Sequence, residues 1–318
     1  MPPMHPKLYH ATPLVESPSL NKRLGRRILV KMECHQPAGS FKIRGVSHLM
    51  LTHVRQGADH FICSSGGNAG LAVAHCAAAL KVRATIVVPE TTRTSVRKLL
   101  ADYGASVHVR GTVWNEADQT ARELCAAGGA VYVSPFDDPL LWEGHSTLVD
   151  ELASQTDPPD AIVLSIGGGG LLCGVLRGMH RNGWRDVPVI AAETEGAASF
   201  AAAVAAGHPV TLDAITTVAT SLGALRISDE AFGWTAKHPV FSAVLSDQEA
   251  IKGCVTLAND LRVLVEPACG VAMAAIEQGC SPLDGCQNVV MMACGGNGVD
   301  TQSLCEWAAV TAGFEQCR

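Results

Sequence analysis

Residues 161–171 read Ala-Ile-Val-Leu-Ser-Ile-Gly-Gly-Gly-Gly-Leu, an apolar run that passes directly into four glycines. The run up to Ile166 is typical of a buried β-strand, and the pattern over Leu171–Asn182 predicts a helix after the glycines. Four consecutive glycines cost backbone entropy, so a turn that only reverses the chain rarely needs them. A cradle of backbone N–H groups around a phosphate explains the tetraglycine better.

The same order of strand, loop and helix recurs along the chain. Strands are predicted at Arg27–Glu33, His60–Ser64, Ala84–Pro89, Ser106–Arg110, Val131–Ser134, Ala161–Ile166, Pro188–Glu193 and Asn288–Ala293. Helices are predicted at Ile43–Gln56, Ala69–Leu80, Thr94–Tyr103, Val113–Ala127, Thr147–Ser154 and Leu171–Asn182, with a loop near Pro135–Pro139. This alternation predicts a parallel α/β architecture, in which ligands gather at the carboxyl ends of the strands.

Composition narrows the class of protein. The chain has 318 residues, which at roughly 150 residues per domain suggests two domains. Charged residues make up 17%, below the roughly 25% usual for soluble proteins, so much of the surface is expected to be buried. A net charge of −6 argues against a nucleic-acid partner, because phosphate binding needs a basic face. No apolar run reaches the roughly 18 residues of a membrane span, and residues 1–7 lack the apolar core of a signal peptide. We therefore expect a cytoplasmic protein with no membrane partner.

Twelve cysteines are the most unusual feature of the composition. None are spaced as Cys-x-x-Cys, and no His-Glu-x-x-His occurs, so metal knuckles and thioredoxin-type redox pairs are disfavoured. Most of these thiols are predicted to be small apolar fillers of the core. Cys294 is the exception, since Cys294-Gly295-Gly296 follows a strand end, where the thiol either faces a ligand or packs in the core.

Lys42 lies in the segment Pro-Ala-Gly-Ser-Phe-Lys-Ile-Arg-Gly at 37–45, after a strand and before a helix. A helix start and partial desolvation both lower a lysine pKa and favour the neutral amine, which can attack an aldehyde to form a Schiff base. The alternative is an ordinary surface lysine.

Two further loops have the composition of ligand sites. Ser64-Ser65-Gly66-Gly67-Asn68-Ala69-Gly70 joins a strand to an alanine-rich helix and is suited to hold an anion, although a turn with an Asn cap explains it almost as well. The tetraglycine is not a dinucleotide fingerprint, because positions 171 and 172 are leucines, and it lacks the Gly-Lys-Ser/Thr of a Walker loop. Glu193 follows the glycines as the ribose-binding acid does in a dinucleotide-binding protein, but without the fingerprint it is not expected to bind ribose.

Together, Ser40-Phe41-Lys42, Ser65-Gly66-Gly67-Asn68, Gly167–Gly170 and Cys294-Gly295-Gly296 resemble the fold-type II pyridoxal-phosphate enzymes, in particular the L-serine dehydratase/L-threonine deaminase branch. The resemblance covers nearly the whole chain. Further matching stretches are Pro135–Pro139, Trp142–His145, Ser246–Ala250 and Val265–Gly270.

The resemblance implies a role for each motif. Lys42 would carry pyridoxal phosphate as a Schiff base, with Phe41 against one face of the pyridine ring. Asn68 would bind the phenolic oxygen of the cofactor, and Ser65, Gly66 and Asn68 would hold the substrate carboxylate. The residues that would bind the phosphate are Gly167, Gly168, Gly169, Gly170 and Leu171. Cys294 would contact the pyridine nitrogen.

The activity implied is β-elimination that converts L-serine to pyruvate and ammonia, and L-threonine to 2-oxobutanoate. Lys42 would remove the α-proton, and Ser65 or the cofactor phosphate would protonate the leaving hydroxyl. Alternatives are serine racemase, a sulfur-amino-acid lyase, or a weakly active dehydratase-like member, since Gly66 stands where some relatives carry alanine. A non-catalytic ligand-binding protein with this fold is a further alternative.

The resemblance also implies an architecture and a cation. The fold would be two open twisted parallel-sheet domains, similar to the tryptophan synthase β subunit, with the cofactor in the interdomain cleft. Residues 1–36 and 137–318 would form the large cofactor-binding domain and residues 37–136 the small one, within a homodimer. A monovalent cation such as K⁺ would bind Gly167, Glu193, Ala197, Ser199, Leu222 and Ala224. The alternative for Glu193 is a salt bridge at a strand end.

Overall fold

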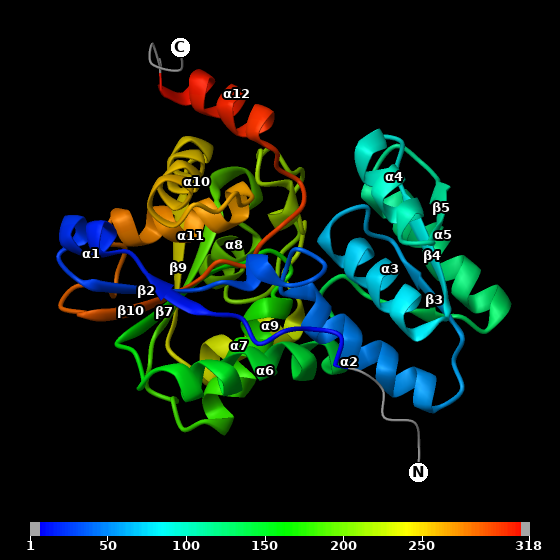
Figure 1. Ribbon diagram of the computed structural model, residues 1–318, viewed down its shortest axis with the longest axis horizontal. Coiled ribbons are helices and arrows are strands. Elements are labelled where there is room, and N and C mark those ends of the chain that lie inside the picture. Colours follow the sequence, from blue (N-terminus) through cyan, green and yellow to red (C-terminus); the bar gives the residue numbers. More distant parts are fainter. Residues whose placement is uncertain (1–6, 313–318) are drawn as a thin grey trace. The chain divides into compact units, whose positions relative to one another are not determined.

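The computed structural model describes residues 7–312, with side chains described through residue 309. The described chain divides into two compact units. Residues 7–11 and 36–145 form unit 1, and residues 12–35 and 146–312 form unit 2. Each unit is built on its own sheet, so the predicted fold class of two parallel-sheet α/β domains is confirmed (Figure 1). The domain borders proposed after residues 36 and 136 stay predictions.

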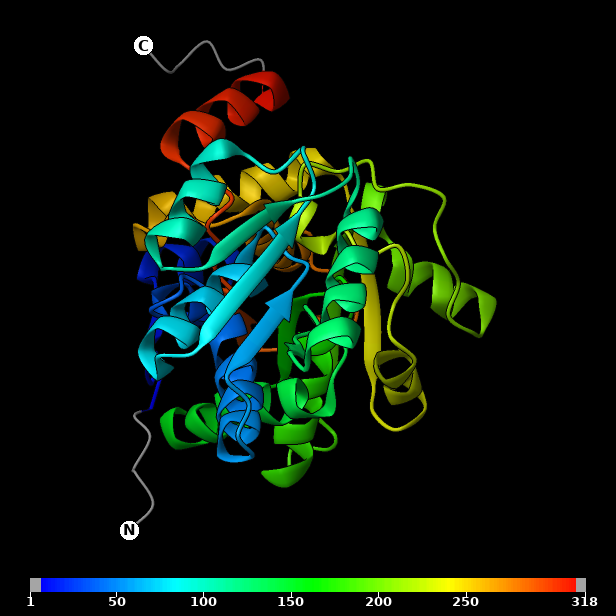
Figure 2. The ribbon, with the colours of Figure 1, turned by 90° about the vertical axis from the view of Figure 1, so that its right-hand side faces the viewer.

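Unit 1 contains a four-stranded sheet in the order β5-β4-β3-β6, and every neighbouring pair is parallel (Figure 2). Its strands are β3 (His60–Cys63), β4 (Arg83–Val88), β5 (Ser106–Val109) and β6 (Val131–Tyr132). Its helices are α2 (Lys42–Arg55), α3 (Asn68–Leu80), α4 (Thr94–Asp102) and α5 (Trp114–Gly128). Helix α5 packs on the sheet because Ala117 and Ala121 are small enough to reach the buried side chains of Ile62 and Val87.

Unit 2 contains a six-stranded sheet in the order β1-β2-β10-β7-β8-β9, parallel except for the edge pair β1–β2. Its strands are β1 (Leu14–Glu16), β2 (Arg27–Lys31), β7 (Ala161–Ser165), β8 (Val189–Thr194), β9 (Val240–Leu245) and β10 (Asn288–Met292). Every residue of β7 and β8 is buried, as expected for central strands covered on both faces.

Several helices and short 3₁₀ turns belong to unit 2. The helices are α1 (Pro18–Leu24), α7 (Gly170–Arg181), α8 (Ser199–Ala206), α9 (Asp229–Gly233), α10 (Asp247–Leu261), α11 (Pro267–Glu277) and α12 (Thr301–Ala312). The 3₁₀ turns are Glu33–His35, Glu195–Ala197, Thr220–Leu222 and Trp234–Ala236. Helices α10 and α11 cross closely, since a Cβ at Gly253 would lie 2.0 Å from the Gly270 carbonyl oxygen.

Helix α6 (Pro139–Gln155) begins in unit 1 and ends in unit 2. The predicted helix started at Thr147, and the predicted loop ran to Pro139, so the predicted start was wrong. Asp138 provides the reason, because its carboxylate accepts the N–H of Leu140 at 2.7 Å and Pro139 occupies the first helical position. An Asp-Pro pair in a sequence is therefore compatible with the start of a helix as well as with a loop.

Other predicted elements agree with the structure to within one or two residues at each end. Strand β2 stops at Lys31 rather than Glu33, because a 3₁₀ turn begins at Glu33. The elements that the sequence patterns did not predict are β1, β9, α1 and α8 to α12. In β9 the burial alternates from Ser242 to Leu245, but the exposed positions include apolar Phe241 and Val244, which removes the usual alternation of apolar and polar residues in the sequence.

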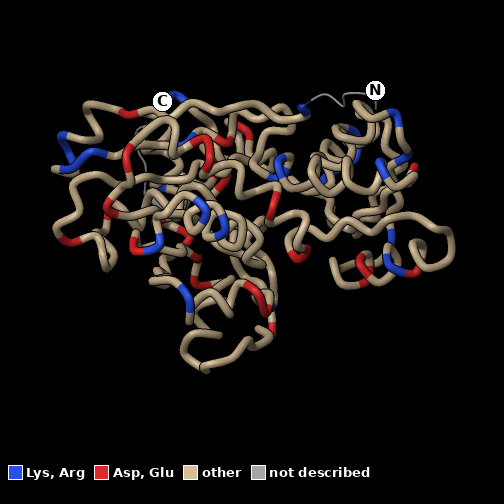
Figure 3. The backbone as a smooth tube through the Cα atoms, turned by 90° about the horizontal axis from the view of Figure 1, so that it is seen from below, with Lys and Arg blue, Asp and Glu red and all other residues tan. Residues whose placement is uncertain are grey.

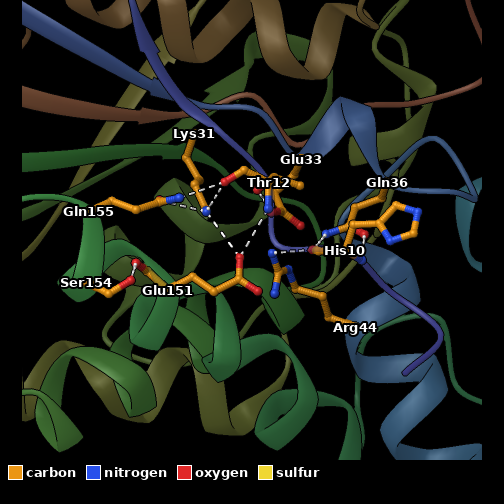
Figure 4. Close-up of polar contacts among 9 residues, drawn as sticks. All are labelled: His10, Thr12, Lys31, Glu33, Gln36, Arg44, Glu151, Ser154 and Gln155. Carbon is orange, nitrogen blue, oxygen red and sulfur yellow. Dashed lines mark hydrogen bonds and ion pairs between the residues drawn. The ribbon is translucent and has the colours of Figure 1, made fainter. Parts of the chain in front are cut away.

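A buried lysine on β2 has a complete set of partners (Figure 4). Lys31 is fully buried, and its Nζ donates to the Thr12 carbonyl at 2.7 Å, to Gln155 Oε1 at 2.9 Å and to Glu151 Oε2 at 3.2 Å. Thr12 in turn donates its hydroxyl to the buried Glu33 carboxylate at 2.6 Å. These contacts offset the cost of burying the charge and fasten the start of unit 2 to α6.

Charged residues of both signs are interspersed along the described chain (Figure 3). Within the same residues no helix is long and apolar enough to cross a membrane.

Candidate active site

Lys42 is the first residue of α2, in unit 1. It therefore lies where a loop passes into a helix, as the sequence predicts. Its Nζ donates to the carbonyl oxygen of Pro135 and lies 5.1 Å from the centre of the Phe41 ring. Burial raises the pKa of the Cys63 thiol, at the end of β3, to about 12, and the charge of Lys42 opposes that rise. The amine therefore lies near the carboxyl end of the unit 1 sheet, where α/β proteins bind ligands.

Behind Phe41 lies a histidine that the sequence analysis left without a role. His145 is fully buried, its ring lies 4.9 Å from that of Phe41, and its Nδ1 accepts the backbone N–H of Gly45 at 3.2 Å. Burial, together with the charges of Lys42 and Arg44, lowers the pKa of His145 well below its usual value, so the ring stays neutral and can accept. A Cβ at Gly45 would lie 2.5 Å from the ring, which explains the glycine at that position.

The loop 64–68 joins β3 to α3, and Asn68 is the first helical residue. The Gly67 N–H donates to Ser65 Oγ at 3.2 Å. A Cβ at Gly70 would lie 1.9 Å from the Ser65 carbonyl oxygen, so the loop lies directly on the first turn of α3. The predicted residues Ser65, Gly66 and Asn68 are therefore gathered at the start of one helix, where unpaired N–H groups favour an anion.

The space beside Gly66 is occupied in this chain. A Cβ there would lie 2.8 Å from Thr92 Cγ2, 2.9 Å from Thr92 Oγ1 and 3.1 Å from Val88 Cγ1. Thr92, from the loop between β4 and α4, thus occupies the space that a side chain at position 66 would need.

The tetraglycine lies in unit 2, between β7 and α7, as predicted. Gly169 has φ +96°, and a Cβ there would lie 2.3 Å from Ala231 Cβ, while a Cβ at Gly167 would lie 3.0 Å from Leu222 Cα. A side chain is therefore excluded at Gly169 and would be crowded at Gly167, while the backbone of Gly168 to Gly170 is buried. The first N–H groups of α7 have no partner within the helix, so the loop and helix start suit a phosphate group.

Cys294 follows β10 in unit 2, with 6% of its surface exposed. Its Sγ lies 3.6 Å from Ser165 Oγ, directly before the glycine loop, and 3.1 Å from Cys269 Sγ. Cys269 also accepts the Gly295 N–H at 3.2 Å. Burial raises the pKa of Cys269 and, to about 12, that of nearby Cys34, so these thiols stay neutral. The contact of Cys269 with Cys294 was not predicted, although both lie in stretches that carry the family resemblance.

The residues of the predicted cation site also lie in unit 2. Glu193 is fully buried, and its two carboxylate oxygens accept the N–H groups of Phe200 and Ala201, each at 2.8 Å. Burial raises the pKa of Glu193 to about 7, and the two backbone bonds oppose that rise. Among the described residues Glu193 forms no salt bridge, so that alternative was wrong. The buried Ser199 Oγ has no hydrogen-bond partner.

The chemistry of these residues fits pyridoxal phosphate. Unit 1 supplies a lysine amine beside an aromatic ring and a helix start suited to a carboxylate. Unit 2 supplies a side-chain-free loop suited to a phosphate and a thiol at the adjacent strand end. The lysine suits the aldehyde of this cofactor, and the aromatic side chain suits its ring. The glycine loop suits its phosphate, and the thiol suits its pyridine nitrogen.

The chain belongs to the family of pyridoxal-phosphate dependent enzymes, whose model matches residues 6–295. Among its relatives is the L-serine dehydratase/L-threonine deaminase of Mus musculus, 46% identical over 310 residues that cover 93% of this chain and 94% of the relative. Its fold is similar to the crystal structure of a fungal L-serine ammonia-lyase from Rhizomucor miehei, with a TM-score of 0.90, 37% identity and coverage of 94% and 98%. Maize serine racemase is also similar, with a TM-score of 0.87, 28% identity and coverage of 94% and 91%.

Proposed function

We propose that this chain is a pyridoxal-phosphate-dependent ammonia-lyase that converts L-serine to pyruvate and ammonia, and L-threonine to 2-oxobutanoate and ammonia. The observation that carries the proposal is Lys42 at the first residue of α2, with its amine beside the Phe41 ring. The same chain is 46% identical to a relative named for both activities.

Bound pyridoxal phosphate supplies an electron sink for the α-carbon of an amino acid, which makes loss of the α-proton and of a β-substituent feasible. Lys42 would hold the cofactor through its Nζ, and the free amine would take the α-proton on the same atom. Phe41 would pack against the cofactor ring, and His145 contacts the Phe41 ring.

Ser65 and Asn68, with the backbone at Gly66, would bind the substrate carboxylate, and Asn68 would also hold the phenolic oxygen of the cofactor. The Ser65 hydroxyl is a proton donor for the departing β-hydroxyl, which leaves as water. Ammonia is released when water replaces the nitrogen of the product.

Gly167 to Gly170 and Leu171 would bind the phosphate through backbone N–H groups, and Cys294 would hold the pyridine nitrogen. A carboxylate in that position would keep the nitrogen protonated and favour transamination. A thiol would not hold a proton on that nitrogen, so the cofactor ring would be a weaker electron sink, which would favour prompt loss of the β-substituent. The raised pKa values of the neighbouring thiols support a neutral environment there.

We also propose that K⁺ binds Glu193, Ser199 and the carbonyl groups of Gly167, Ala197, Leu222 and Ala224. Three observations support this set: the buried carboxylate of Glu193, the unpartnered Ser199 hydroxyl, and the close packing of Gly167 on Leu222. Within the described residues no group of three or more His, Cys, Asp or Glu side chains could hold a metal ion, so this site depends mainly on carbonyl oxygens.

The test is to incubate the purified protein with L-serine and measure pyruvate and D-serine, with Lys42→Ala as the control. We expect pyruvate from L-serine, 2-oxobutanoate from L-threonine, and neither from the control. D-Serine without pyruvate would instead identify a racemase. Replacing K⁺ by Na⁺ is expected to lower the rate, and equal rates in both salts would contradict the cation site.

A homodimer and a cytoplasmic location complete the proposal. The low content of charged residues supports a buried subunit interface. Light scattering during size-exclusion chromatography is expected to give twice the mass of one chain, and the mass of a single chain would contradict the dimer.

A further inference from the structure

A network of hydrogen bonds is centred on Asp118, in the middle of α5 in unit 1. Asp118 Oδ1 accepts the Ser64 hydroxyl at 2.6 Å and also accepts the hydroxyl of Tyr132. Asp118 Oδ2 accepts Arg122 Nε at 2.8 Å. Both carboxylate oxygens are therefore bonded, and they tie α5 to the end of β3 and to β6.

The electrostatics of the network keep Asp118 ionised. Burial alone would raise its pKa, but the hydrogen bonds from Ser64, Tyr132 and Arg122 outweigh burial and lower it. Burial, followed by the bond to Asp118, raises the pKa of Tyr132, so the phenol remains a donor. Arg122 lies over the Tyr132 ring, 4.2 Å from its centre. The network is thus a fixed carboxylate surrounded by donors, not a pair of groups that exchange a proton near neutral pH.

The network ends one residue before the proposed substrate loop. Ser64 is fully buried, and Ser65 follows it directly. On its other side, Ser65 is confined by two contacts. Its hydroxyl accepts the Gly67 N–H, and its carbonyl oxygen lies so close to Gly70 that a side chain at position 70 would have no room. A shift of Ser64 would therefore be transmitted to Ser65 rather than absorbed by the loop.

We propose that Asp118 is a positioning residue that fixes Ser65 and the following loop by anchoring the Ser64 hydroxyl. Asp118 acts through Ser64 and is not a catalytic residue. The inference rests on the proposed function, because it is the binding of the substrate carboxylate by this loop that gives the anchor its purpose.

The informative substitution is Asp118→Asn. Asparagine keeps the shape of the side chain but has one acceptor oxygen, so its NH₂ group would oppose the N–H of Arg122 or displace one of the hydroxyl donors. We expect KM for L-serine to rise on the order of tenfold, since small misplacements of binding groups have effects of this size or larger. The value of kcat should fall as well, because the same loop carries Ser65, the proposed proton donor to the departing hydroxyl.

A matched control exists at the opposite end of β3 from Ser64. Asp59 pairs with Arg83 at 3.1 Å just before the start of β3, where both side chains are exposed. Asp59→Asn removes the same kind of ion pair at the end of the strand away from the loop, so KM should stay unchanged. Tyr132→Phe removes one donor and keeps the ring, and it should give a smaller rise in KM than Asp118→Asn.

The experiment measures KM, kcat and amide hydrogen exchange over residues 64–70 for the four proteins. Faster exchange in this loop, together with the raised KM, is expected for Asp118→Asn but not for Asp59→Asn. If both variants behave alike in both measurements, or if Asp118→Asn changes neither, the inference is overturned. If the wild type makes no pyruvate, the proposed function fails, while the hydrogen exchange still decides whether Asp118 anchors the loop. If Asp118→Asn does not fold, the same comparison between Tyr132→Phe and Asp59→Asn decides.

Discussion

Gly169→Ala is expected to damage both the stability of unit 2 and its affinity for the cofactor. Two effects add at this position. The backbone has φ +96°, which costs about 1–2 kcal/mol for a residue with a side chain, and the new Cβ would lie 2.3 Å from Ala231 Cβ. Relieving such a clash in a packed region costs about 1–3 kcal/mol. We therefore expect a loss of about 2–5 kcal/mol in the free energy of unfolding.

The same helix provides a control that separates these two effects. Gly183 follows the C-terminal end of α7 with φ +79°, and nothing lies within 4 Å of its Cβ position. Gly183→Ala therefore carries the backbone cost alone, about 1–2 kcal/mol. Gly167→Ala, without positive φ, tests the contact with Leu222 alone.

The assay is calorimetric unfolding of the three apoproteins, followed by titration with pyridoxal phosphate. A loss of 1 kcal/mol lowers the melting temperature of a domain of this size by about 2–4 °C. Gly169→Ala should melt below Gly183→Ala and bind the cofactor at least about tenfold more weakly, a change of about 1.4 kcal/mol. Equal melting temperatures, or an unchanged affinity in Gly169→Ala, would refute the packing and the role assigned to this loop.

Three further predictions concern other parts of the molecule. Gly66→Ala should lower the melting temperature, because its Cβ would lie 2.8 Å from Thr92 Cγ2 and 2.9 Å from Thr92 Oγ1, and a second change, Thr92→Ala, should raise it again; no recovery would count against this contact. Lys31→Met should destabilise the apoprotein by about 3 kcal/mol, since it leaves a carboxylate without its buried partner, and urea unfolding measures this. His180 Nε2 and His238 Nδ1 are 3.2 Å apart, and burial lowers the pKa of each histidine below 6.5 in the folded protein. The stability that the pair of neutral histidines contributes to the fold is therefore present above pH 6.5 and is lost as the pH falls through the folded pKa values. Melting temperatures across this range should fall more steeply for the wild type than for His180→Gln, and parallel curves would contradict the assignment.

The strand and helix order was largely readable because the central strands are buried on both faces. β7 and β8 therefore appear as continuous apolar runs between loops that contain glycine or proline. The edge strand β9 has no such pattern, since apolar Phe241 and Val244 are exposed beside buried Ala243. Hydrophobic periodicity reports burial only where exposed positions carry polar residues, so it fails in this strand.

The candidate site was predictable where chemistry concentrates in one short segment. Lys42 and the glycine loop were predictable because each lies in a short segment whose own residues indicate its chemistry. His145, Cys269 and Asp118 were not. Each acts by touching a residue far away in the chain, such as Phe41 or Cys294, and such contacts arise only when the sheets are assembled.

The central claim is that Lys42 binds pyridoxal phosphate, and chemical mapping tests it most directly. The holoenzyme is reduced with borohydride, digested, and the peptides are analysed by mass spectrometry, with Lys42→Ala treated in parallel. The account predicts one pyridoxyl group, on the peptide that contains Lys42, and none in the variant. A pyridoxyl group on another lysine, or no adduct in a protein that forms pyruvate from L-serine, would contradict it.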